Sequence, residues 1–87
     1  MFKPIVLTYD TDIRHAGVQR LQKSLEKWQW PYVILEDAAG WRGFGRKFKL
    51  VADAAAKIRD NGGFTHVISI DARDCIAVGP PSEFVAP

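Results

Sequence analysis

Two aspartates, Asp71 and Asp74, come directly after an apolar run and have the spacing best suited to chemistry. Two carboxylates three residues apart at the end of a buried strand can share a hard divalent cation such as Mn²⁺ or Mg²⁺. A cation held in this way keeps open positions for phosphate oxygens. The same residues also suit an ordinary turn in which Arg73 pairs with either acid. Spacing alone slightly favours the turn.

A second pair of carboxylates, Asp10 and Asp12, follows another apolar run, Pro4–Tyr9. The two could form a further acidic site, but aspartate at such a position often turns the chain or caps the next helix. We favour the capping interpretation. In the same segment, the hydroxyls of Thr8 and Thr11 could hydrogen-bond a nucleotide base or ribose.

The segment around Gly43 and Gly45 combines glycine, aromatic and basic residues. It imitates a dinucleotide-binding fingerprint but places Phe48 where glycine or alanine is required. A helix that begins here would offer free amides to an anion such as a diphosphate. An ordinary solvated helix start explains the basic residues about as well, namely Arg42, Arg46, Lys47 and Lys49. Trp41, in a glycine-flanked loop, is typical of a residue that stacks on a planar ligand or covers a crevice.

Hydrophobic periodicity predicts the elements that position these residues. Strands are expected at Pro4–Tyr9, Tyr32–Leu35 and His66–Ile70, each of the type that is buried on both faces. Helices are expected from Ala16 to just before Pro31 and over Arg46–Asp60. Their core-facing stripes are Val18, Leu21, Leu25 and Trp28 in the first, and Phe48, Val51, Ala55 and Ile58 in the second.

This order predicts an α/β fold, a Rossmann-like βαβαβ three-stranded parallel sheet with flanking helices. Ligands of such sheets bind outside the carboxyl ends of the strands. The polar residues named above all lie at those ends, so they are expected to gather at one edge of the sheet.

The 87 residues, 47% hydrophobic with a net charge of +2, describe one compact domain over 1–87. A charge so near balance argues against a dedicated nucleic-acid binder. Cys75 is the only cysteine, which excludes an intrachain disulfide. No stretch approaches the roughly 20 apolar residues of a membrane span, and 1–12 lacks a signal-peptide pattern, so a cytoplasmic protein is expected. Two-substrate α/β enzymes usually need roughly 200 residues, which indicates a binding domain or part of something larger.

In chain order, four segments resemble the start of a GT-A type glycosyltransferase. The likeness is greatest to the glycosyltransferase domain of the procollagen lysyl hydroxylase/galactosylhydroxylysine glucosyltransferase family. The shared features are an opening strand, a Trp-x-Gly loop, a glycine-rich helix start with a lysine, and an Asp-x-x-Asp strand end before an apolar run and Gly-Pro. In this chain they are Val6–Thr11, Trp41–Gly43, Gly43–Leu50 and Asp71–Pro80. The resemblance covers nearly the whole chain and implies the nucleotide-binding half of a GT-A fold.

The resemblance implies transfer of a glycosyl group from a UDP-sugar to an acceptor hydroxyl. Asp71 and Asp74 would bind Mn²⁺, or Mg²⁺, which bridges the diphosphate and stabilises the departing UDP. Trp41 would border the donor site and Lys47 would approach the phosphates. Arg73 replaces the tyrosine of the family's Asp-x-Tyr-Asp pattern and could pair with phosphate instead. The uridine would be touched by Thr8, Tyr9, Asp10 and Thr11.

Two features of the family are missing from the sequence. The family's third metal ligand, a histidine, lies with the acceptor-binding half well beyond Asp-x-x-Asp, and neither His15 nor His66 occupies a matching position. We therefore expect a donor-binding portion, incomplete relative to a full glycosyltransferase, whose catalysis needs residues outside this chain. The alternative is a non-catalytic remnant or small adaptor that acts through protein contacts. Its exposed sheet edge would pair with a second copy or a partner strand.

Overall fold

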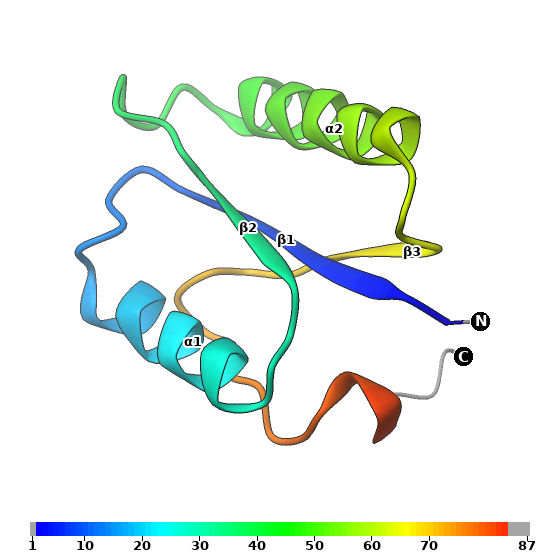
Figure 1. Cartoon of the computed structure of the whole chain (residues 1–87). Helices are drawn as coiled ribbons and strands as arrows, with labels where there is room; N and C mark the ends of the chain where they lie inside the picture. Colours follow the sequence, from blue (N-terminus) through cyan, green and yellow to red (C-terminus); the bar gives the residue numbers. More distant parts are fainter. Residues whose placement is uncertain (1, 84–87) are drawn as a thin grey trace.

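Three strands and two helices alternate along the chain in the computed structural model, which describes residues 2–83 (Figure 1). The predicted α/β class and the order of its elements are confirmed, and boundaries move by only a few residues. The first helix ends at Lys27 rather than just before Pro31, and the second begins at Phe44 rather than Arg46. The elements are β1 (Pro4–Asp10), α1 (Ala16–Lys27), β2 (Tyr32–Glu36), α2 (Phe44–Asn61), β3 (His66–Ser69) and a short 3-10 helix, η1 (Pro81–Glu83).

The three strands form one parallel sheet in the order β2-β1-β3, with β1 in the centre. Val6 of β1 lies opposite Tyr32 of β2 on one side and opposite Ile68 of β3 on the other. The usual Rossmann half places its strands in the order third, second, first. The parallel sheet is therefore confirmed, whereas the strand order differs because the chain crosses back over β1 before it forms β3.

The two helices cover opposite faces of the sheet (Figure 1). All seven residues of β1 are buried. On the α1 side, a core cluster joins Val6 to Ala72 and to three fully covered side chains of α1, Val18, Leu21 and Leu25. Three of the four residues predicted for the core stripe of this helix are thus buried, and the fourth, Trp28, is half-buried. Within residues 2–83, no helix combines the length and the apolar composition that crossing a bilayer requires.

The edge strands and α2 are less buried than the sequence suggests. Of the strands expected to be covered on both faces, β2 is half-buried and β3 mostly exposed, because each lies at an edge of the sheet. No residue of α2 is fully buried. Phe48, predicted to face the sheet, is 63% exposed. The half-buried stripe instead passes through Lys47, Val51, Ala54 and Ile58, and Phe48 lies one position, about 100°, around the helix from it.

The segment that follows β3 runs along α1 and is tied to it at several points. Arg20 Nη2 donates to the Arg73 carbonyl at 3.3 Å, and the Ala77 amide donates to Ser24 Oγ at 2.8 Å. Further on, Trp30 Nε1 donates to the Gly79 carbonyl at 2.8 Å. These bonds fix where the Asp71–Asp74 turn lies relative to the first helix.

Candidate functional site

β2 lies on one side of β1 and β3 on the other, so the two crossover connections lead in opposite directions along the sheet. The point where this direction changes lies between the carboxyl ends of β1 and β3. In open α/β sheets this switch point is where ligands bind. An open cavity of about 330 Å³ lies there, lined by Tyr9, Asp10, Thr11, Trp41 and Arg73. All five were selected from the sequence. Thr8 is the exception among the nucleotide-binding candidates of β1, since it is 1% exposed and its hydroxyl donates to the Ile70 carbonyl at 2.7 Å.

Asp10 and Arg73 form a two-pronged ion pair in the wall of this cavity. Arg73 Nε donates to Asp10 Oδ2 and Nη2 to Oδ1, each at 2.9 Å. Burial raises the pKa of Asp10, but the hydrogen bonds from Arg73 and from the amides of Asp12 and Thr11 outweigh it and leave this pKa below its usual value. The expected pairing of Arg73 with Asp71 or Asp74 is wrong, because a planar guanidinium finds the better-oriented carboxylate in Asp10.

Asp37, Arg46 and Tyr9 form a second polar cluster beside the cavity. Arg46 Nε and Nη2 donate to the Asp37 carboxylate at 2.7 and 3.0 Å, and the Tyr9 hydroxyl donates to the same carboxylate at 2.8 Å. These bonds hold the pKa of Asp37 well below its usual range. Burial and the neighbouring carboxylate raise the pKa of Tyr9. The cluster joins the ends of β1 and β2 to the first turn of α2.

Asp37 lies two residues after the predicted strand Tyr32–Leu35, but neither it nor its pairing with Arg46 was predicted to have a role. The available signal was the same one that selected Asp10, a carboxylate directly after an apolar strand. The Asp37 amide donates to the Asp10 carbonyl at 2.9 Å, so the two strand-end aspartates lie on neighbouring strands at the same level. Each is matched by an arginine, which leaves neither carboxylate free for a cation.

The two remaining strand-end carboxylates, Asp71 and Asp74, are exposed on the turn after β3. Lys47 Nζ lies 3.5 Å from Asp71 Oδ1 and 6.0 Å from the centre of the Tyr9 ring. Among residues 2–83, no group of three or more His, Cys, Asp and Glu side chains could together hold a metal ion. The pair therefore does not fit a cage made of protein alone. Two exposed carboxylates hold a cation such as Mg²⁺ only together with other ligands, such as substrate phosphates and water.

Asp12 turns the chain into α1, as the favoured interpretation of this segment expects. Its amide donates to Asp10 Oδ1 at 2.9 Å, and its Oδ1 accepts from the Arg14 amide at 3.0 Å. The cap itself is His15, whose Nδ1 accepts from the Gly17 amide at 3.0 Å. Asp12 thus shapes the loop beside the cavity and forms no second metal site with Asp10.

Trp41 stands at the rim of the cavity on a loop with left-handed glycines at both ends. Gly40 has φ +84° and Gly43 has φ +93°, a backbone region that favours glycine. The indole is 53% exposed and meets the Phe44 ring edge-on at 5.0 Å. Its position confirms that it is a loop residue outside the core and leaves much of the ring accessible to a planar ligand.

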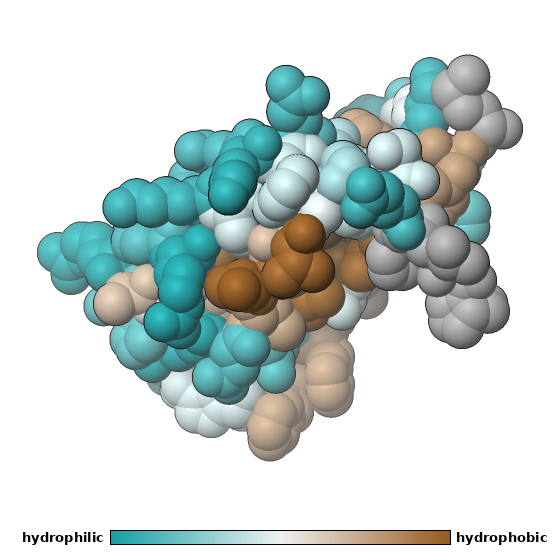
Figure 2. Space-filling model, turned by 90° about the horizontal axis from the view of Figure 1, so that it is seen from below, coloured by the Kyte–Doolittle hydropathy of each residue, from teal (hydrophilic) through white to brown (hydrophobic). Residues whose placement is uncertain are grey.

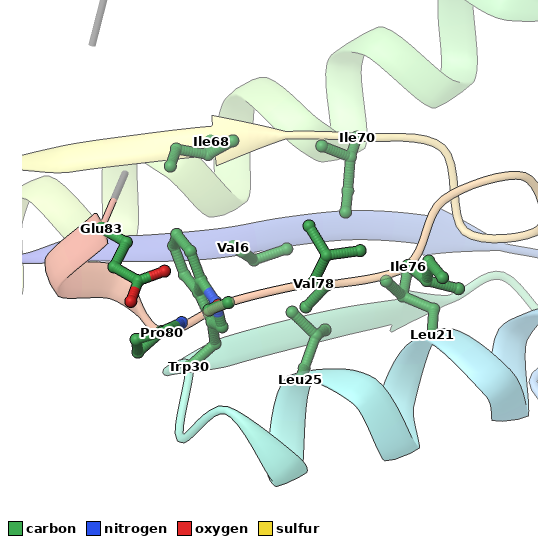
Figure 3. A pocket seen from close by; sticks show the side chains of 12 residues that line it. Val6, Leu21, Leu25, Trp30, Ile68, Ile70, Ile76, Val78, Pro80 and Glu83 are labelled. Atoms are coloured by element: carbon green, nitrogen blue, oxygen red, sulfur yellow. The ribbon is translucent and has the colours of Figure 1, made fainter. Parts of the chain in front are cut away.

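A second cavity, of about 350 Å³, lies between α1, the sheet and the segment after β3 (Figure 3). Its lining is almost wholly apolar and includes core side chains such as Leu21 and Leu25. Figure 2 shows the apolar surface on this side of the molecule, where Ile76 is 54% and Val78 81% exposed. None of the residues predicted to bind a nucleotide or metal lines it, so the cavity at the switch point is the better candidate site.

Comparisons with known proteins give this chain no relatives. No protein-family model, no curated protein and no solved structure matches it. The fold and the geometry of the strand ends are therefore what bears on its function.

Proposed function

We propose that the chain binds the nucleotide diphosphate of a UDP-sugar at the carboxyl edge of its sheet. In this proposal it is the donor-binding part of a GT-A type glycosyltransferase, which passes the sugar to an acceptor hydroxyl. The observation that carries the proposal is the cavity at the switch point, where Tyr9, Thr11 and Trp41 meet beside the exposed Asp71–Asp74 turn. A parallel α/β sheet binds its ligand at this place.

Each group at this edge has a part in the proposal. Trp41 offers an exposed indole face for the uracil ring, since stacking on aromatic rings suits flat heterocycles. Lys47, already beside Asp71, supplies positive charge for the diphosphate. Asp71 and Asp74 hold Mn²⁺ or Mg²⁺, which as a Lewis acid stabilises negative charge on the departing UDP.

Arg73 has a structural role in this proposal in addition to the phosphate contact expected of it. Because both prongs of its guanidinium are bound to Asp10, it braces the cavity wall and holds the metal-binding turn against β1. This pair uses only Nε and Nη2, so the N–H groups of Nη1 stay available on a side chain that is 43% exposed.

Donor binding and complete glycosyl transfer are separate proposals. The described residues place no third carboxylate, thiol or imidazole with Asp71 and Asp74. We therefore propose donor binding for this chain and assign the transfer step to a longer protein that contains it.

Calorimetric titration with UDP in the presence of Mn²⁺ tests the proposal. We expect binding that is lost when EDTA removes the metal, and that Asp71→Asn or Asp74→Asn weakens by about tenfold or more, as is common for changes around a bound metal. Asp53→Asn is the matched control, because Asp53 is an exposed α2 carboxylate without an ion pair among the described residues. A titration without detectable binding in Mn²⁺, or binding that neither EDTA nor Asp74→Asn changes, would overturn the proposal.

The alternative, an adaptor that acts through protein contacts, is favoured by a different observation. β3 lies at an edge of the sheet, and Ile76 and Val78 expose apolar surface close to it. An open strand edge with apolar neighbours invites pairing with another chain. Light scattering over a range of concentrations tests self-association, and a strictly monomeric chain contradicts pairing with a second copy.

A further inference from the structure

Three aromatic side chains form an exposed strip at the start of α2. Trp41 meets Phe44 edge-on at 5.0 Å, and Phe44 stacks on Phe48 at 6.0 Å. Their exposed fractions are 53%, 64% and 63%. A run of large apolar rings, each more than half in water, is unusual on a monomer and marks a surface that contacts something else.

The positive charge of the chain is concentrated in the segment that carries this strip. Residues 41–61 contain six lysines and arginines against two aspartates, which leaves six basic and eight acidic residues for the remainder of the chain. Three of the six basic residues pair with aspartates, namely Arg46, Lys47 and Arg59. No carboxylate within residues 2–83 forms an ion pair with the other three, Arg42, Lys49 and Lys57. The helix that carries the strip therefore presents net positive charge that its own fold does not neutralise.

The shape of this surface distinguishes between anionic partners. α2 is the outermost layer on its side of the sheet (Figure 1). Neither of the two cavities described above is lined by Phe44 or Phe48. Single-stranded nucleic acid binds in a basic groove, whereas a convex helix with protruding rings matches a broad, soft surface. Aromatic rings with flanking Lys and Arg are the combination that binds the headgroup region of an anionic bilayer.

We propose that the strip Trp41–Phe44–Phe48 docks the chain on an anionic membrane surface. The rings enter the boundary between headgroups and acyl chains, and Arg42 and Lys49 attract anionic headgroups. This peripheral contact does not depend on nucleotide-sugar binding. It places the cavity bordered by Trp41 next to the lipid surface.

Co-sedimentation with vesicles of phosphatidylcholine, with and without phosphatidylserine, tests the docking. We expect binding to the anionic vesicles only, weakened by salt. Phe44→Ser/Phe48→Ser should lower the partition coefficient by about tenfold or more, because two buried rings are lost. Arg42→Gln/Lys49→Gln should lower it by about fivefold for each charge removed.

The control variant is Ile76→Ser/Val78→Ser, which removes comparably exposed apolar side chains on the α1 side. It should sediment like the original chain, and circular dichroism should show all variants folded. The proposal is overturned by equal sedimentation with both vesicle types, by none with either, or by an equal loss in the control. Binding of a single-stranded oligonucleotide that needs Phe44 and Phe48, without vesicle binding, would also overturn it. Because Trp41 is left intact, the UDP titration remains an independent test of the nucleotide site.

Discussion

Replacing Gly17 by alanine sets two opposite effects against each other at the start of α1. Alanine in place of glycine inside a helix normally stabilises it by up to about 1 kcal/mol. At this position, however, a Cβ would lie 2.6 Å from the carbonyl oxygen of Arg73 and 3.0 Å from its Cα. Both are backbone atoms, so the contact is relieved only if α1 or the Asp71–Asp74 turn moves.

The expected outcome follows from the sizes of the two effects. Overpacking costs about 1–3 kcal/mol, and a contact this short with backbone atoms belongs to the upper part of that range, about 2–3 kcal/mol. After subtraction of about 1 kcal/mol for helix propensity, Gly17→Ala should lower the free energy of unfolding by about 1–2 kcal/mol. For a domain of this size, each kcal/mol lowers the melting temperature by about 4–8 °C. The displaced turn should also lose the hydrogen bond from Arg20 to the Arg73 carbonyl, 3.3 Å in the native chain.

Urea unfolding followed by tryptophan fluorescence measures this difference. The matched control is Gly45→Ala in α2, where a Cβ would meet nothing within 4 Å. That variant should be unchanged or more stable by up to about 1 kcal/mol. If Gly17→Ala is as stable as the original chain or more so, the close packing of α1 on the segment after β3 is refuted.

Two further predictions concern stability. Leu21→Ala, at a side chain that is 0% exposed, should lower the free energy of unfolding by about 2–5 kcal/mol. Leu50→Ala, at a half-buried site of α2, should lower it by less. Equal decreases of the two variants in urea unfolding would contradict a core centred on α1. Asp10 and Asp37 have pKa values below their ordinary 3.8 in the folded chain. Both carboxylates therefore stabilise the fold fully at a pH above 3.8. This stabilisation is lost on acidification, because the unfolded chain takes up protons at a higher pH than the folded chain does. The urea midpoint should therefore fall as the pH drops below about 4, and Asp37→Asn should flatten this dependence; an identical acid profile in the variant would refute the role of the Asp37–Arg46 pair.

Local pattern was enough to predict the strands and helices of this fold. The continuous apolar run Ile5–Leu7 and the helical period of Val18–Leu25 depend only on neighbours in sequence. Local pattern could not predict the strand order, since the position of β1 between β2 and β3 depends on which pairs of distant strands bury more surface. Phe48 shows the limit within one element: the other residues predicted for its stripe, Val51, Ala55 and Ile58, are half-buried, whereas Phe48 at the start of the helix is exposed.

The sequence indicated where the candidate site lies but not which of its side chains pair with one another. Knowing that polar residues gather at strand ends was sufficient to select Asp10, Trp41 and Asp71. The pairing of Asp10 with Arg73 joins residues 63 apart in the chain, and no local pattern specifies such a contact. The Asp37–Arg46 pair bridges a loop whose path depends on the left-handed glycines beside Trp41. Arg46 was therefore considered only as part of a basic helix start, and its pairing with Asp37 was missed.

The central position of β1 also has a consequence for how the chain folds. β1 precedes both of its partners, so during synthesis its apolar residues remain with at least one bare edge until β3, at His66–Ser69, has left the ribosome. Parallel pairing across crossovers is slow because the loops must close before any pairing is gained. The nascent chain therefore passes through a stage in which the strand that is most buried in the native fold is a template for wrong pairing. Chaperone demand during translation should accordingly end abruptly once residue 69 is free to reach the sheet.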